Sequence, residues 1–289
     1  MVENQLRTYP VFVMCGRDPR RRRLMEVIDP EGKYKSKALL PFLGRRLVEW
    51  QLEELRQSPY VGDVYLLGLS ETDLPLAYPV HYVPVTTDAE FADKLVQGLD
   101  YLETHGDLPD MIVISSCDTP GIRVEDINTF FNELAVVGGM EFVLSLVPEE
   151  VIEAEFPGSG RVVARFRDGP VLPGELFALS PRVIREHSEV IHQLSSRRRK
   201  INRQKKKIGM GPILRYVGRK PRVWLLLLGY VLHLATLRGA EKAISAAFGI
   251  PTRGVVIPEA SFGMDMDLPE DYERLKDYVR RTKLGGLGQ

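Results

Sequence analysis

A regular alternation of short apolar runs with amphipathic helical patterns, over about the first 150 residues, is the feature that most constrains the fold. Each apolar run is bounded by turn residues and is short enough for one buried strand. The runs are Val11–Cys15, Asp63–Leu69, Val80–Val83, Met111–Ser115 and Glu141–Val147. Helical patterns separate them over Arg46–Gln57, Asp88–Glu103 and Val124–Val137. Strands that alternate with helices predict a three-layer α/β/α fold around a mostly parallel, mixed sheet.

The pattern changes after residue 150. Arg161–Phe166, a turn at 168–170 and Leu176–Leu179 predict a hairpin or meander near a sheet edge. The chain then reads as a helical stretch over Pro181–Arg203, a helix over Ala240–Phe248, a strand over Gly254–Ile257 and a last helix over Pro269–Arg281. We expect one domain over 1–289, with a basic and apolar helical insertion at about 181–250.

Charge is distributed unevenly although the net charge is zero, with 39 Lys and Arg against 39 Asp and Glu. The 26 residues of 197–222 hold 12 Lys and Arg and no acid, which leaves a net charge of −12 on the other 263. The apolar run that follows, over Val223–Leu237, has 15 residues and is shorter than the roughly 20 that span a bilayer. An anionic partner is therefore expected near this segment.

Two cysteines, Cys15 and Cys117, are too few for a disulfide framework, and the N-terminus has no signal-peptide pattern. Both observations predict a cytoplasmic protein. Each cysteine follows a predicted strand at the same sheet edge, so the two thiols are expected to lie near each other as buried packing rather than as a redox pair.

Residues just after the strands of an open parallel sheet line its ligand crevice. After the first strand the chain reads Cys15-Gly16-Arg17, with further arginines at 20–23, and then a long loop to Lys37. Glycine allows close approach of backbone N–H groups to phosphate, and the cations neutralise it, so this loop suits a triphosphate. The alternative is a solvated basic turn.

Carboxylates occupy two other strand ends. Asp118 follows Met111–Ser115 and is placed to hold Mg²⁺; the alternative is that it caps the helix near Val124. Asp265 and Asp267 follow the late strand, where one of them could instead cap the last helix, with Pro269 in its first turn. Together the three acids predict a divalent-cation site of the kind that phosphoryl transfer uses.

Taken in this order, the motifs resemble the MobA-like nucleotidyltransferases, which are related to sugar-nucleotide pyrophosphorylases. The stretch Lys37-Ala38-Leu39-Leu40-Pro41 through Trp50 is similar to the family's Lys-x-Leu-Leu-Pro motif, and Asp265–Tyr272 is similar to its late Asp-x-Asp motif. The resemblance implies a nucleotide-diphospho-sugar transferase fold, also called glycosyltransferase-A-like. It also implies Mg²⁺- or Mn²⁺-dependent transfer of NMP from an NTP to a phosphorylated acceptor, with release of pyrophosphate.

The resemblance assigns roles to individual residues. Lys37, Asp118 and Asp267 are the expected catalytic residues, and Asp118, Asp267 and Asp265 the expected metal ligands. The expected nucleotide-binding residues are Met14, Cys15, Gly16, Arg17, Arg23, Lys37, Thr87 and Asp93. The expected acceptor-binding residues are Arg161, Gly174 and Glu175. Which of Arg17 and the arginines at 20–23 contacts phosphate stays open, and Thr87 or Asp88 could simply cap the helix that follows.

A phosphate monoester acceptor is already anionic near neutral pH and requires no general base, which suits a chain whose five histidines follow no predicted strand. The acceptor classes that remain open are sugars, alditols, cofactors and lipids. Residues 197–228 could contact an anionic membrane surface, so a peripheral location is an alternative, as is a buried helix or homodimer face. No nucleic-acid recognition motif is found.

Two other functions remain open. A glycosyltransferase that uses a nucleotide sugar would share the fold and metal chemistry, although the Asp-x-Asp of that class follows a mid-chain strand. A non-catalytic nucleotide-binding or membrane-docking relative would bind nucleotide without turnover.

Overall fold

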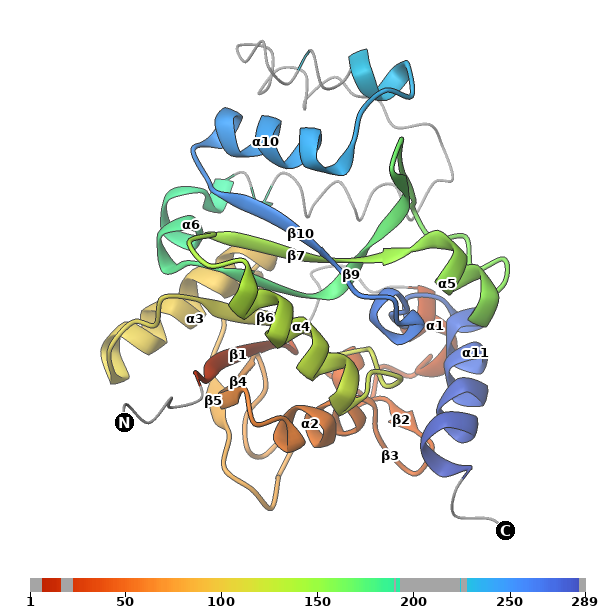
Figure 1. Ribbon diagram of the computed structural model, residues 1–289. Coiled ribbons are helices and arrows are strands. Elements are labelled where there is room, and N and C mark those ends of the chain that lie inside the picture. The colour runs from red at the N-terminus through yellow and green to blue at the C-terminus, as the bar shows by residue number, and fades with distance from the viewer. Residues whose placement is uncertain (1–6, 17–22, 190, 193–223, 225–227, 286–289) are drawn as a thin grey trace, which may run out of the picture.

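A mixed sheet forms the centre of the protein (Figure 1). The structure is a computed structural model and describes residues 7–16, 23–189, 191–192, 224 and 228–285. Among these residues the strand order is β10-β7-β9-β6-β1-β4-β5, and β8 pairs with β9 outside this path. The strands are β1 (Tyr9–Met14), β4 (Val61–Leu67), β5 (His81–Val83), β6 (Ile112–Ser116), β7 (Phe142–Pro148), β8 (Ala164–Phe166), β9 (Gly169–Leu179) and β10 (Thr252–Val256).

Strand direction explains where a ligand site can form. β1 pairs in parallel with β4 and β6, β4 with β5, and β7 with β10, whereas β9 is antiparallel to both β6 and β7. The carboxyl ends of β1, β4 and β6 therefore meet at one edge of the sheet. The predicted α/β fold with a mostly parallel, mixed sheet is confirmed.

Helices cover both faces of the sheet (Figure 1). The helical elements are α1 (Arg23–Ile28), η1 (Lys37–Leu39), α2 (Leu47–Gln57), α3 (Phe91–His105), α4 (Val124–Val136), α5 (Glu149–Glu155), α6 (Pro181–Glu186), α10 (Leu237–Phe248), η2 (Ala260–Gly263), α11 (Pro269–Val279) and the π-helical turn η3 (Arg280–Leu284). A short antiparallel pair, β2 (Pro41–Phe42) and β3 (Arg45–Arg46), precedes α2. Each predicted helix between residues 46 and 137 is found within a few residues of its expected bounds.

The two faces of the sheet bury separate apolar clusters because successive side chains of a strand point to opposite sides. Val11 and Val13 of β1 pack in the cluster that includes residues of α2, α4 and α11. Phe12 between them packs in the other cluster, with residues of α3 and α6. Both faces of the sheet are therefore covered by apolar side chains. Polar side chains that form a site are expected at the strand ends instead.

The position of β9 corrects one expectation. The sequence places residues 161–179 near a sheet edge, but β9 lies between β6 and β7, in the interior of the sheet. The register shifts along the β7 pairing between Leu144 and Leu146, opposite Pro173 to Phe177. Pro173, which has no N–H to donate, pairs with β7 alone, because the β6 pairing extends only over Leu176–Leu179.

The predicted insertion is described only at its ends. Val183 and Ile184 of α6 are buried in the same cluster as α3, and α10 packs on β10, which is an edge strand. The predicted helix over Pro181–Arg203 is interrupted, because α6 ends at Glu186. Residues 193–223 and 225–227, and with them nearly all of the predicted anionic-surface segment 197–228, lie outside the described residues.

The start of α3 also differs from expectation. The helix begins at Phe91 after the N-cap residue Glu90, so neither Thr87 nor Asp88 caps it. Instead the Asp93 carboxylate accepts a hydrogen bond from the Glu90 backbone N–H at 2.8 Å.

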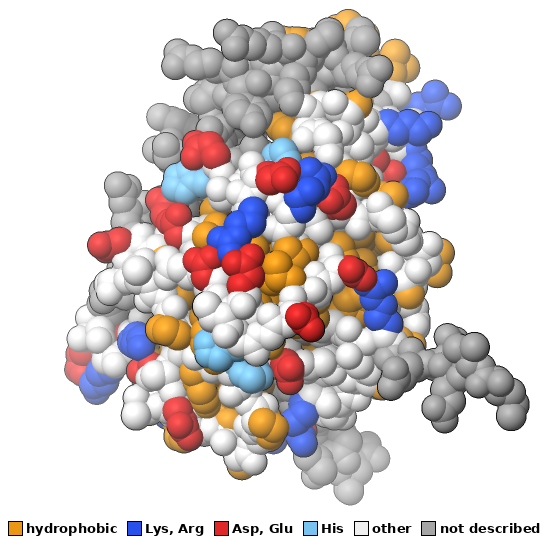
Figure 2. Space-filling model, turned by 90° about the vertical axis from the view of Figure 1, so that its left-hand side faces the viewer, with side chains coloured by type: hydrophobic (Ala, Val, Ile, Leu, Met, Phe, Trp, Pro, Cys, Tyr) orange, Lys and Arg blue, Asp and Glu red, His pale blue; other side chains and the backbone are white. Residues whose placement is uncertain are grey.

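The outer surface of α3 and α6 carries paired charges. Arg185 forms ion pairs with Asp100 and Glu103, and Arg182 with Glu141 and Glu186. Figure 2 shows this side of the molecule, where red and blue side chains stand next to each other. None of the described helices is both long and apolar enough to cross a membrane.

Gly98 determines how closely α3 approaches β1. A Cβ atom at Gly98 would lie 2.6 Å from Phe12 Cε2 and 2.9 Å from Leu67 Cδ2, both in fully buried side chains. We therefore expect Gly98→Ala to lower the free energy of unfolding by about 1–3 kcal/mol, despite the higher helix propensity of alanine. Urea denaturation measures the change. Gly138→Ala, where a Cβ has nothing within 4 Å, is the control; equal stability of the two variants would contradict the expected clash.

Candidate active site

Three segments far apart in the sequence meet at the carboxyl ends of the strands. Asp118 follows β6, Lys37 begins η1, and Asp265 and Asp267 lie in the loop between η2 and α11. The backbone N–H of Met266 donates to the Asp118 carbonyl at 3.0 Å, which joins the late loop to the end of β6. One carboxylate oxygen from each of Asp118, Asp265 and Asp267 lies within 4.8 Å of the others.

Lys37 connects two of these carboxylates. Its Nζ forms an ion pair with Asp118, and lies 2.9 Å from Asp267 Oδ1 and 2.9 Å from the Met266 carbonyl. The Lys37 side chain is only 12% exposed. A buried ammonium ion that bridges two carboxylates offsets a repulsion that would otherwise drive them apart.

Arg161 pairs with the third carboxylate from the other side. Its guanidinium forms an ion pair with Asp265, donates to the Asp265 carbonyl, and lies 3.3 Å from Asp271 Oδ2. Burial opposes the charged form of Arg161, but the carboxylates of Asp265 and Asp271 raise its pKa above the usual value. The guanidinium is therefore held at the carboxylate cluster.

The start of α11 is stabilised by Asp271, so the alternative that Asp265 or Asp267 caps this helix is not found. Asp271 Oδ2 accepts from the backbone N–H of Leu268 at 2.9 Å and of Asp267 at 3.2 Å, so the side chain inside the helix makes the cap contacts. Neither Asp265 nor Asp267 is the N-cap residue, which is Leu268, whereas Pro269 lies in the first turn as predicted. The side chains of Asp265 and Asp267 consequently face the cluster.

Burial and neighbouring carboxylates disfavour a charged Asp265. Burial raises the pKa of Asp265 to about 8, and the neighbouring carboxylate of Asp267 adds to this effect, although Arg161 opposes it. The pKa of Asp271 is also raised, chiefly by burial. Carboxylates that lie this close together and are this poorly hydrated favour the binding of a further cation.

The phosphate-loop candidates lie beside this cluster. Cys15 is buried, and its carbonyl accepts a hydrogen bond from the hydroxyl of Ser36, the N-cap residue of η1. Gly16 approaches the end of β4, since a Cβ at Gly68 would lie 2.4 Å from Gly16 Cα. Met14, half-buried, ends β1 next to them. The loop between Gly16 and Arg23 is where a phosphate chain is expected.

The structure places only some of the other expected nucleotide-binding residues. Arg17 and residues 20–22 lie outside the described residues, and Arg23 forms an exposed ion pair with Glu270 at 3.3 Å. Thr87 and Asp93 are exposed near the start of α3. Their nucleotide roles stay predictions.

The acceptor-side candidates lie near Asp265. Glu175 is buried in β9, and its charge acts on both Arg161 and Asp265. The backbone at Gly174 lies against the Ser145 side chain and leaves no room for a side chain of its own, because a Cβ there would lie 2.3 Å from Ser145 Oγ. The structure thus brings Arg161 and Glu175 to the carboxylate cluster, and their acceptor role stays a prediction.

The thiols of Cys15 and Cys117 are neighbours, as expected. Burial raises the pKa of the Cys15 thiol well above its usual value, and a hydrogen bond with Cys117 contributes. Both cysteines are buried and form no disulfide.

Sequence reasoning missed one buried cation, Lys94 of α3, which is 5% exposed. Its position in the sequence carried a signal, because it lies on the apolar stripe of α3 with Leu95, Gly98 and Leu99. It also missed that Arg161 pairs with Asp265, because the two residues are 104 positions apart.

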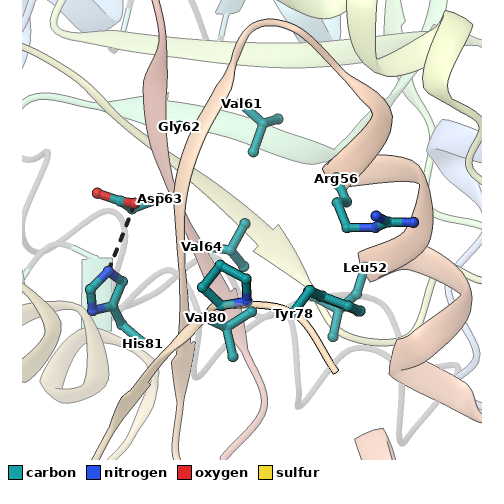
Figure 3. A pocket seen from close by; sticks show the side chains of 10 residues that line it. Leu52, Arg56, Val61, Gly62, Asp63, Val64, Tyr78, Val80 and His81 are labelled. Carbon is teal, nitrogen blue, oxygen red and sulfur yellow. Dashed lines mark ion pairs between the residues drawn. The ribbon is translucent and has the colours of Figure 1, made fainter. Parts of the chain in front are cut away.

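A hollow of about 230 Å³ lies elsewhere on the surface, between α2 and the β4–β5 edge (Figure 3). Asp63, Val64, Tyr78 and His81 are among its lining residues, and His81 Nε2 lies 3.8 Å from Asp63. Residues 61–64 form the amino end of β4, whereas the site lies beyond its carboxyl end at Leu67. This hollow is therefore separate from the carboxylate cluster.

The fold is that of nucleotidyltransferases. A hypothetical transferase from Thermus thermophilus superposes with a TM-score of 0.69 and 24% identity, covering 92% of this chain and 99% of that one. A CMP:2-keto-3-deoxy-manno-octonic acid synthetase has a TM-score of 0.57 and 14% identity, covering 95% and 99%. A nucleotidyl transferase from Methanothermobacter thermautotrophicus has a TM-score of 0.54 and 14% identity, covering 96% and 99%. No curated protein sequence matches the chain.

The chain belongs to the family of the MobA-like NTP transferase domain, whose model matches residues 11–206. The resemblance stated from the sequence motifs is thereby confirmed, and the protein is a nucleotidyltransferase. The matched range includes Lys37 and Asp118, whereas Asp265 and Asp267 lie beyond it and are brought to them by the fold.

Replacing Lys37 tests whether its ammonium holds the carboxylates together. Lys37→Met leaves Asp118 and Asp267 facing each other, so we expect the free energy of unfolding to fall by about 3 kcal/mol in metal-free buffer. Urea denaturation with EDTA present measures it. Lys33→Met, whose side chain is 69% exposed and paired with Glu31, is the control and should change little; a Lys37→Met protein as stable as this control would contradict the bridging role.

Proposed function

We propose that this protein transfers NMP from an NTP to a phosphorylated acceptor, with release of pyrophosphate, in a reaction that depends on Mg²⁺ or Mn²⁺. The observation that carries the proposal is the cluster of Asp118, Asp265 and Asp267 around the Lys37 ammonium, at the carboxyl ends of the strands. Membership of the NTP transferase family supports the reaction class. The synthetase with the same fold was solved as a complex with CTP, which supports a nucleoside triphosphate as donor.

The residues present fit a divalent cation. All three donors are carboxylate oxygens, the hard ligands that Mg²⁺ and Mn²⁺ take. The raised pKa of Asp265, caused by burial and by the charge of Asp267, indicates that the cluster is short of positive charge. We assign the ligation chiefly to Asp118 and Asp267, because their partner Lys37 has a flexible stem that can turn to phosphate, whereas Arg161 holds Asp265 through both its carboxylate and its carbonyl. When bound, the cation supplies charge that offsets the negative phosphate oxygens.

The protein's own groups then position and neutralise the substrate. Gly16 has no side chain of its own, which lets backbone N–H groups approach the phosphate chain closely. Lys37, with a long flexible stem, exchanges its carboxylate partners for phosphate oxygens as the nucleotide enters. In-line attack on the α-phosphorus requires positioning and charge neutralisation more than covalent catalysis.

The acceptor in this proposal carries a phosphate. Its anionic oxygen attacks without a general base, and within the described residues no histidine stands among the groups of the carboxylate cluster. We assign the acceptor side to the Arg161, Gly174 and Glu175 region, because Arg161 pairs with Asp265 and the charge of Glu175 acts on it. Sugars, alditols, cofactors and lipids are the acceptor classes to screen.

Turnover provides the test of the reaction. Pyrophosphate release is measured with ATP, GTP, CTP or UTP, Mg²⁺ and a panel of phosphorylated acceptors. Asp118→Asn and Asp267→Asn are each expected to lower turnover by about 10²–10³-fold, the usual loss of one electrostatic transition-state contact. Asp110→Asn, at a side chain that is 85% exposed, is the control and should keep full turnover. Acceptor-dependent release that survives both cluster substitutions would refute the site.

Metal binding is tested separately from turnover. Mg²⁺ or Mn²⁺ at 100 times its dissociation constant should stabilise the protein by about 2.7 kcal/mol, seen as a rise in Tm. Asp118→Asn and Asp267→Asn should abolish the rise, whereas Asp110→Asn should keep it. A wild-type Tm that neither cation changes, with or without nucleotide, would exclude the metal.

A further inference from the structure

Lys283 contacts the turn that follows Asp118, although it lies near the other end of the chain. It belongs to the π-helical turn η3, and its side chain is 8% exposed. Its Nζ donates to the Ile122 carbonyl at 2.6 Å and lies 2.8 Å from Glu54 Oε1 of α2. The Ile122 N–H in turn donates to the Thr119 carbonyl at 3.2 Å, so this turn closes directly behind Asp118.

Two further contacts hold the same turn. The other carboxylate oxygen of Glu54, Oε2, accepts from the backbone N–H of Val124 at 2.8 Å, where α4 begins. The ring of Tyr278 in α11 packs against Gly121, since a Cβ atom at Gly121 would lie 3.0 Å from Tyr278 Cε1. The turn is therefore held at its end by Glu54 and Lys283, and in its middle by an aromatic ring.

One continuous helical segment reaches both loops that carry the candidate metal ligands. η3 follows α11 directly, and Arg280 at their junction keeps helical backbone angles, with φ −58° and ψ −46°. At the start of α11, the Asp271 carboxylate accepts from the Asp267 N–H at 3.2 Å. At the far end, Lys283 contacts the turn after Asp118. The segment formed by α11 and η3 thus connects the loop of Asp267 with the turn after Asp118.

The ammonium of Lys283 is maintained at a cost in solvation. Burial lowers its pKa and the nearby charge of Arg123 acts in the same direction, whereas the carboxylates of Glu54 and Asp126 oppose this effect. A methionine would fill the same space without desolvating a charge, but it would donate no hydrogen bond to the Ile122 carbonyl. A lysine at this position is therefore best explained by the acceptors that it holds in place.

We propose that Lys283 is a positioning residue, which holds the turn after Asp118 and thereby the placement of the Asp118 carboxylate relative to that of Asp267. This assignment rests on the function proposed above. Lys283 acts through the backbone of that turn rather than as a ligand. Groups that orient metal ligands typically contribute about 10- to 100-fold to metal affinity or activity. Because Lys283 lies beyond the range 11–206 of the family model, this contribution comes from the C-terminal part of the chain.

The experiment measures Mn²⁺ binding to the full chain by titration calorimetry, without nucleotide. Lys283→Met is expected to raise the Mn²⁺ dissociation constant by about 10-fold, at the low end of the loss caused by removing a group that supports a metal ligand. Arg280→Met is the matched control, because it removes a charge from the same helical turn at a side chain that is 54% exposed. This control should bind Mn²⁺ as wild type does.

A second control separates positioning from a general loss of stability. Gly98→Ala is expected to lower stability through its clash with Phe12 and Leu67, without altering the turn after Asp118. It should therefore leave the Mn²⁺ dissociation constant of the folded protein unchanged.

Glu54→Gln tests the same contact from the other partner, and it remains informative if Lys283→Met does not fold. It removes the charge that pairs with Lys283 and keeps the size of the side chain, so it should also weaken Mn²⁺ binding. The double substitution should weaken binding by less than the product of the two single effects. Mn²⁺ binding by folded Lys283→Met or Glu54→Gln that equals wild type would overturn the assignment, as would an equal loss in Gly98→Ala. Absence of Mn²⁺ binding by wild type would instead refute the metal site of the proposed function.

Discussion

The bridge that Lys37 makes between Asp118 and Asp267 is the interaction on which the site depends. It joins η1, the end of β6 and the loop before α11, three segments that are separated by up to 230 positions in the sequence. Carboxylates this close repel one another, and burial removes the water that would screen them. The ammonium of Lys37 on one side and the guanidinium of Arg161 on the other make the arrangement tolerable within a folded protein.

The same electrostatic arrangement supports the proposed phosphate chemistry. The neighbours of the carboxylates hold them in place before anything binds, which is the preorganisation that the proposed cation site requires. Asp271 contributes indirectly, since its carboxylate accepts the first N–H groups of α11 and leaves Asp267 facing the cluster. The beginning of α11 and the candidate metal ligands are therefore one local structure.

The helices and strands were predicted best where the spacing of apolar residues marks the buried face of an element. The helices near residues 46–57 and 124–137, and the strands that become β1 and β6, follow directly from apolar spacing. The predicted hairpin of β8 and β9 is found, but its place near a sheet edge was wrong, because nothing local distinguishes an edge strand from one that inserts between two others. The caps that the sequence left open as alternatives for α3 and α11 are not found, because acidic residues inside the helices, Asp93 and Asp271, accept the terminal N–H groups.

The sequence by itself determined the class of fold and the acids and lysine that form the cluster, because strand ends and motif residues are local features. Only the tertiary structure decided that Arg161 pairs with Asp265, that Lys37 lies between two of the carboxylates, and that Lys283 contacts the turn after Asp118. These contacts join residues from separate elements, and their distances are determined by sheet order and by glycines that permit close approach. No pattern along the chain encodes such distances.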